Sequence, residues 1–167
     1  MTASPYGILF VCTGNICRSP AAEGVLIHHA RERGLLPALH IDSAGTTGYH
    51  VGESADPRTI RSARARGYHL PSRARRVTPA DLQRFQLVVA MGLEHLDELE
   101  TLARRHPSSA ELRLYCEFLN YPARRDVPDP YYGGPEGFEH VMDLIEEATP
   151  NILDHVERCR AAAHTQD

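Results

Sequence analysis

The sequence predicts an α/β fold, a three-layer sandwich with a four-stranded parallel sheet. Two observations predict this class. Short buried-strand patterns alternate with helical patterns along the 167 residues, which is typical of a parallel sheet covered by helices on both faces. The length suits a single domain over residues 1–167, with room for one hydrophobic core.

The first half of the chain predicts two strands and two helices. Residues 7–12 form a short apolar run between turn residues, which is typical of a buried strand. The pattern becomes helical from Ser19, and Gly34 is suited to end that helix. Residues 38–43 predict a second strand, and residues 56–66 predict a polar amphipathic helix.

The second half continues the alternation. Residues 87–91 predict a buried strand, followed by a helix with leucines three residues apart over 93–102. Residues 111–118 predict a weaker strand. Apolar residues recur at helical spacing over 138–156, and we expect Pro150 to kink this last helix.

Composition excludes several classes of function. A formal net charge of −4 argues against nucleic acid or acidic lipid as a partner. The chain has 18 arginines and no lysine, which excludes lysine-based chemistry such as a Schiff base. Its longest apolar run, residues 6–12, is too short to cross a membrane and lacks the basic segment of a signal peptide. Four cysteines suit reduced thiols, and hence a cytoplasmic location. We expect residues 161–167 to fray.

The string Val-Cys-Thr-Gly-Asn-Ile-Cys-Arg-Ser-Pro, residues 11–20, carries the most specific signal. Cys12 ends the first strand, at the edge of the sheet where ligands of such folds bind. The backbone N–H groups of the loop and the following helix N-terminus form an anion site, which also stabilises a thiolate. Arg18 offers a planar fork for two phosphate oxygens. Gly14 and Asn15 tolerate the positive φ of a tight loop.

These features predict a phosphate-binding loop after the first strand. Ser19 is placed to cap the helix and to donate to the sulfur of Cys12, with Pro20 at the first helical position. The residues expected to bind phosphate are Thr13, Gly14, Asn15, Ile16, Cys17 and Arg18.

The string resembles the signature of the low-molecular-weight protein tyrosine phosphatases. Asp129-Pro130-Tyr131-Tyr132 resembles the late Asp-Pro loop of that family, and segments 42–45 and 55–58 also fit, so the resemblance covers nearly the whole chain. It implies removal of phosphate from phosphotyrosine in proteins through a phosphocysteine intermediate. No cofactor is implied, and inorganic phosphate or vanadate would inhibit.

By this resemblance Cys12 is the nucleophile, Arg18 the phosphate clamp and Asp129 the general acid. Thiolate attack on a phosphate ester needs a proton for the departing oxygen, and hydrolysis of the intermediate needs a base, so one carboxyl can serve both steps. Prolines on both sides would hold Asp129 in place. Asp126 is the competing candidate, which we expect to be a solvated loop charge.

Substrate choice is expected to depend on Ile16, Tyr49, Tyr131 and Tyr132. Related phosphoarginine phosphatases carry a threonine at the position of Ile16, whereas an aliphatic side chain presents an apolar wall to an aromatic ring. The tyrosines correspond to aromatic positions at the entrance in family members, where they would contact a phenyl ester. Tyr49 is otherwise an ordinary loop residue.

The chain departs from the family pattern at two positions. Ser72 stands where the family usually has histidine, and Gly92 where it usually has aspartate. In the family both side chains support the phosphate loop. Because both side chains are missing, we expect another support network or a water molecule in their place. The other supporting residues, Asn15, Ser19 and Ser43, remain. Glu23 would brace Arg18 or be a plain surface carboxylate.

Cys17 raises a redox hypothesis. A curled loop would bring it near Cys12, and family members with this pair form a reversible disulfide under peroxide. Alternatively, Cys17 packs beneath the loop. Cys116 and Cys159 are expected to be ordinary packing or surface thiols. The histidines and cysteines show no His-x3-His or Cys-x2-Cys spacing, so no metal site is expected.

Two other functions share these features. A thiol-dependent arsenate reductase uses a similar loop but needs further redox cysteines after the third strand, where this chain has only Cys116, on a predicted strand. A phosphoprotein-binding module would need no nucleophile, so the combination of Cys12, Arg18 and Asp129 argues against it.

Overall fold

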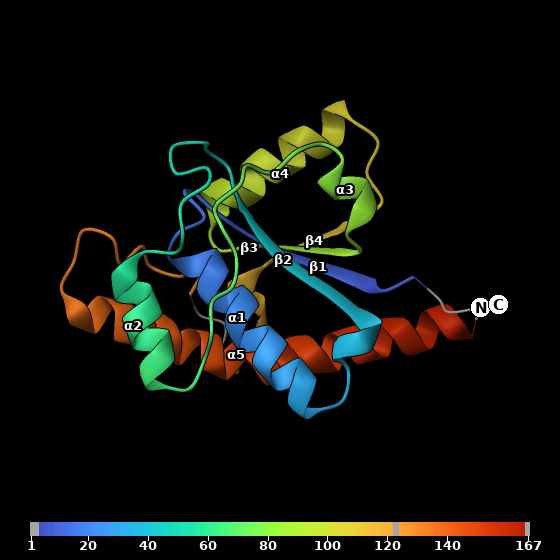
Figure 1. The fold of residues 1–167 in the computed structure, drawn as a ribbon. Helices are drawn as coiled ribbons and strands as arrows, with labels where there is room; N and C mark the ends of the chain where they lie inside the picture. The colour runs from blue at the N-terminus through green and yellow to red at the C-terminus, as the bar shows by residue number, and fades with distance from the viewer. Residues whose placement is uncertain (1–3, 122–123, 166–167) are drawn as a thin grey trace.

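The computed structural model describes residues 4–121 and 124–165. Its centre is a parallel sheet whose four strands follow the order β2-β1-β3-β4, which confirms the predicted fold class (Figure 1). The strands are β1 (Tyr6–Cys12), β2 (Leu39–Gly45), β3 (Leu87–Ala90) and β4 (Glu111–Leu114). All of them run the same way, so the carboxyl ends of β1 and β3 meet at one edge.

Helices cover both faces of the sheet (Figure 1). On one face lie α1, α2 and α5, and on the other lie α3 and α4. Their bounds are α1 (Arg18–Glu32), α2 (Pro57–Ala65), α3 (Asp81–Arg84), α4 (Leu93–Arg105) and α5 (Pro135–His164), with short 3-10 helices η1 (Leu36–Ala38) and η2 (Tyr115–Phe118). None of the helices in the described part of the chain is long and apolar enough to cross a membrane.

The alternation of side chains along β1 builds two cores. Ile8 and Phe10 pack into the cluster that includes residues of α1 and α5. Leu9 and Val11 pack on the opposite face, in the cluster that includes Leu99 of α4. Because β1 is buried on both faces, its continuous apolar run is what a central parallel strand requires. The loop that follows it therefore starts from a strand that is buried on both faces.

Two expectations about the strands need correction. The predicted strand over 111–118 ends at Leu114, because the Glu117 carboxylate accepts the Leu114 N–H at 3.0 Å and the chain turns into η2. The second strand begins and ends one to two residues later than predicted, at 39–45. The last helix runs from Pro135 to His164 with Pro150 in its interior, so it includes residues 161–164 of the expected tail. Residues 166–167 of that tail lie outside the described residues.

Candidate active site

The loop between β1 and α1 curls back at the carboxyl edge of the sheet. Asn15 has a φ of 59°, as predicted, which an asparagine tolerates better than most residues. Gly14 is not among the glycines with positive φ. It is needed for space instead, since a Cβ there would lie 3.0 Å from the His50 ring.

The start of α1 differs from the expectation. The helix begins at Arg18, Cys17 is its N-cap residue, and no side chain caps it. Ser19 therefore does not cap the helix, and Pro20 is the third helical residue, where its missing N–H is still tolerated. The hydroxyl of Ser19 lies 3.0 Å from the Cys12 sulfur. This contact was predicted.

A buried network of hydrogen bonds supports the loop from below. Asn15 donates through Nδ2 to the hydroxyls of Ser19, at 2.8 Å, and Ser43, at 2.9 Å. Ser43 donates to Glu23 Oε1 at 2.6 Å. The Arg75 N–H donates to Asn15 Oδ1 at 3.0 Å. These bonds fix Asn15 in its left-handed conformation, and through Ser19 they reach the Cys12 sulfur.

Glu23 accepts the hydrogen bond of Ser43 in this network. Neither of the two roles that we expected for Glu23 is found. Its side chain is buried, so it is neither a brace for the guanidinium nor a surface carboxylate. Burial raises the pKa of Glu23 to about 7, and hydrogen bonds from Ser43 and Ser72 oppose that rise. Ser72, which stands where the family usually has histidine, thus lowers the pKa of Glu23.

Arg18 links the loop after β1 to the segment that contains Val127 and Asp129. Its side chain is buried. One terminal nitrogen donates to the Val127 carbonyl at 3.1 Å, and the other lies 3.4 Å from Thr13 Oγ1 and 3.6 Å from Asp129 Oδ2. These contacts aim the guanidinium at the mouth of the loop and place the Asp129 carboxyl beside it.

Asp126 occupies the space that a side chain at Gly92 would need. A Cβ at position 92 would lie 2.6 Å from Asp126 Oδ1. The same oxygen accepts the N–H of Leu93 at 2.7 Å, at the first residue of α4. Asp126 is exposed, as expected, but it is not a free loop charge. It caps α4, whose own N-cap residue is a glycine without a capping side chain.

Buried His95 supplies a second support that the sequence did not reveal. Its Nε2 lies 2.7 Å from Thr13 Oγ1, so α4 contacts the phosphate loop through this ring. Burial, with a smaller contribution from the charge of Arg18, lowers the pKa of His95 to about 4. The ring is thus neutral at physiological pH and adds no positive charge beside Arg18.

The site opens into a cavity of about 270 Å³. It is lined by Cys12, Thr13, Gly14, Ile16, Cys17, Arg18, Thr47, Tyr49, His50, Asp129, Tyr131 and Tyr132. The structure thus gathers the expected catalytic and substrate-pocket residues around one cavity. Asn15 is absent from the lining because its side chain is turned into the supporting network. Tyr49 and Tyr132 are 86% and 91% exposed, which places them at the rim.

Two residues of the cavity wall, Thr47 and His50, were missed, and so was Arg58, which lies outside the lining. His50 lines the cavity and lies 2.6 Å from Glu53 through Nδ1. Arg58 pairs with Asp56 at 2.8 Å and donates to the Tyr131 carbonyl at 3.1 Å, so it ties the acid loop to α2. The only signals in the sequence were the position of His50 beside Tyr49 and the Asp-Pro-Arg segment before α2.

The cysteines are free thiols in the structure. Cys17 is buried and packs with Ile16, Ala74 and Phe138, and burial raises its pKa to about 12. Cys116 is buried in η2 rather than on a strand as predicted.

Comparisons with known proteins match this geometry. The family model of the low molecular weight phosphotyrosine protein phosphatases matches residues 7–162. A low molecular weight protein-tyrosine-phosphatase of Streptomyces coelicolor is 43% identical over 150 residues, which cover 89% of this chain and 92% of that protein. The crystal structure of an Entamoeba histolytica protein tyrosine phosphatase has a TM-score of 0.85 at 37% identity, over 93% of this chain and 99% of that one. A Drosophila arginine phosphatase has a TM-score of 0.85 at 29% identity, over 89% and 96%. The chain therefore belongs to the low molecular weight phosphotyrosine protein phosphatase family.

Proposed function

We propose that this protein removes phosphate from phosphotyrosine in other proteins through a phosphocysteine intermediate on Cys12. The observation that carries the proposal is one cavity lined by a cysteine at a strand end, a buried arginine and a carboxyl 3.6 Å from that arginine. Four free thiols suit a reducing compartment, and we place the protein in the cytoplasm.

In the first step the Cys12 thiolate attacks phosphorus. The bond from phosphorus to the tyrosine oxygen breaks as the sulfur–phosphorus bond forms, and Asp129 gives its proton to the departing phenolate. Arg18 and the loop N–H groups hold the phosphoryl oxygens, whose negative charge they stabilise in the transition state. The Ser19 hydroxyl, 3.0 Å from the sulfur, stabilises the thiolate by donating to it.

In the second step water attacks the phosphocysteine. The ionised Asp129 carboxylate takes a proton from that water, the sulfur–phosphorus bond breaks, and phosphate leaves the regenerated thiolate. Inorganic phosphate, as the product, and vanadate, as its analogue, would therefore occupy the same loop and inhibit.

The wall of the cavity favours a phenyl ester. Ile16 presents an aliphatic side chain beside the loop, and Tyr131 stands next to Asp129 with its ring packed edge-on against Tyr132, the ring centroids 4.9 Å apart. Aromatic rings and an aliphatic wall suit a phenyl ring by stacking and edge contacts. A phosphoserine side chain is too short to fill the distance between the rim and the floor.

Turnover of phosphopeptides tests the proposal. Wild type should hydrolyse p-nitrophenyl phosphate and phosphotyrosine peptides well ahead of phosphoserine and phosphoarginine peptides. Cys12→Ser should lose turnover but still bind vanadate, because the anion site consists of backbone N–H groups and Arg18. Equal turnover of phosphoserine and phosphotyrosine, or substantial activity in Cys12→Ser, would overturn it.

A further inference from the structure

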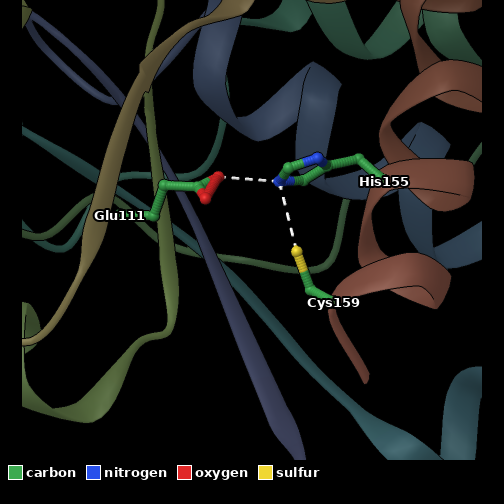
Figure 2. Close-up of side chains that lie close together, drawn as sticks. All are labelled: Glu111, His155 and Cys159. Carbon is green, nitrogen blue, oxygen red and sulfur yellow. Dashed lines mark hydrogen bonds and ion pairs between the residues drawn. The ribbon is translucent and has the colours of Figure 1, made fainter. Parts of the chain in front are cut away.

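A second cluster of reactive side chains lies at the edge of the sheet opposite to the phosphate loop. Glu111 is the first residue of β4, whereas Cys12 is the last residue of β1, and the strands are parallel. His155 and Cys159 stand one helical turn apart on α5, so both side chains project from the same face of that helix. Figure 2 shows the three side chains turned toward one another.

The donor atoms of this cluster are close enough to share one ion. The ligand atoms of Glu111, His155 and Cys159 all lie within 4.8 Å of one another. His155 Nε2 is 2.7 Å from Glu111 Oε1 and 3.5 Å from Cys159 Sγ. Among the described residues, no other group of three histidine, cysteine or acidic side chains meets this condition.

The geometry fits tetrahedral zinc. With a Zn–S bond of about 2.3 Å and a Zn–N bond of about 2.0–2.1 Å, the nitrogen and sulfur ligands are about 3.5 Å apart. The separation of His155 and Cys159 already has this value. The Glu111–His155 contact is shorter because the two groups share a proton. An ion in place of that proton requires the Glu111 oxygen to move away from His155 Nε2 by roughly 0.6 Å and to lie about 3.6 Å from Cys159 Sγ. The half-exposed Glu111 side chain allows this movement.

The surroundings hold the ligands and keep the charge balanced. The Phe118 ring packs edge-on against His155 with centroids 5.5 Å apart, which orients the imidazole. Arg113 lies 3.5 Å from Glu111 but is engaged by Glu117 at 2.7 Å, so it does not compete strongly for Glu111.

We propose that Glu111, His155 and Cys159 bind a divalent transition-metal ion of the zinc class, with the fourth position open to water. A carboxylate and a thiolate would neutralise the two charges of the ion, and nitrogen, oxygen and sulfur together are typical zinc donors. On binding, the Cys159 thiol proton and the proton shared by His155 and Glu111 leave for solvent. The bound ion joins the end of α5 to the start of β4 and stabilises the fold.

Metal titration of the full-length protein tests the proposal. Metal-free wild type is titrated with zinc against a chromophoric chelator and with cobalt, whose thiolate charge-transfer absorption reports a sulfur ligand. Wild type should bind one equivalent more than Cys159→Ser and His155→Gln, or bind that equivalent at least about 100-fold more tightly. Cys116→Ser, which removes a buried thiol elsewhere, is the matched control and should titrate like wild type. Zinc at the phosphate loop is recognised separately, because vanadate should displace it in every variant.

Thermal unfolding gives a second readout that does not depend on activity. Free zinc at a hundredfold excess over its Kd should raise the Tm of wild type and Cys116→Ser by about 5–10 °C, and should not do so in Cys159→Ser. If His155→Gln fails to fold, Cys159→Ser decides the question, since it keeps the Glu111–His155 hydrogen bond. Equal stoichiometry, affinity and Tm shift in wild type and Cys159→Ser would overturn the proposal and leave a helix-to-strand ion pair.

Discussion

Replacing Glu23 with glutamine should make the protein more stable at alkaline pH. The side chain is buried beneath the phosphate loop, where its Oε1 accepts the Ser43 hydroxyl at 2.6 Å. Glutamine has the same shape and an oxygen that accepts the same hydrogen bond, but it cannot ionise. The substitution therefore isolates the cost of a buried charge from the loss of a contact.

The magnitude follows from the pKa of Glu23, which burial raises from 4.5 to about 7. Between these two values the folded protein keeps a proton that the unfolded chain has released. The free energy of unfolding consequently falls as the pH rises, by about 1.4 kcal/mol per pH unit. Below pH 4.5 the carboxyl is protonated in both states and does not lower the free energy of unfolding. Above about pH 7 the loss of unfolding free energy reaches its full value of about 3 kcal/mol.

Thermal unfolding at pH 5 and pH 8 measures this cost. The difference in Tm between Glu23→Gln and wild type should increase by about 5–10 °C from pH 5 to pH 8. This increase corresponds to about 2–3 kcal/mol in the free energy of unfolding. The lowered pKa of His95 destabilises both proteins alike as the pH falls, so it cancels in the difference. Glu98→Gln, an exposed position on α4, is the matched control. A pH dependence shared by wild type and Glu23→Gln would refute the reasoning.

Four further substitutions test the site. Asp129→Asn should lower turnover of aryl phosphates by roughly 10²–10⁴, because the general acid is lost. Asp126→Ala should leave turnover near wild type and lower the free energy of unfolding by about 1 kcal/mol, because the α4 cap is lost. Steady-state kinetics and thermal melts of both variants check this, and the reverse pattern would identify Asp126 as the acid. Ile16→Thr should raise phosphoarginine turnover relative to phosphotyrosine, measured on matched peptides, and a wild-type preference for phosphoarginine would contradict our interpretation of Ile16. After mild peroxide and then dithiothreitol, wild type should recover most of its activity through a Cys12–Cys17 disulfide and Cys17→Ser markedly less; equal recovery would leave Cys17 a packing residue.

Local sequence was sufficient to predict the elements that depend on neighbouring residues. The apolar run of β1 and the Asp-Pro start of α2 both specify structure within a few positions, and Asp56 does accept the Arg58 N–H at 2.8 Å as an N-cap. The positive φ of Asn15 in the loop after β1 was likewise predictable, because a tight turn favours residue types that tolerate it.

Support of that loop was not predictable, since it depends on residues distant in sequence. Asp126 caps a helix that begins 33 positions earlier, and His95 reaches Thr13 across 82 positions. Neither contact leaves a periodic pattern or a spacing that sequence reasoning can detect. Glu23 was misread for the same reason: it lies on α1, and its partner Ser43 lies on β2, 20 residues away.

The same limit applies to the cluster of Glu111, His155 and Cys159. His155 and Cys159 are spaced to share one helix face, but they form neither a His-x3-His nor a Cys-x2-Cys pattern. The third member lies 44 positions before His155 and joins the cluster only when β4 and α5 are folded together.

Isolation of the phosphorylated enzyme tests the central claim most directly. Asp129→Asn should still form the intermediate from p-nitrophenyl phosphate, whose leaving group needs little protonation, but should hydrolyse it slowly because the base is missing. Acid quenching during turnover, followed by peptide mass spectrometry, should then find one phosphoryl group on the peptide that contains Cys12, and specifically on its sulfur. Release of p-nitrophenol without phosphate on Cys12, or with phosphate on another residue, would contradict the account.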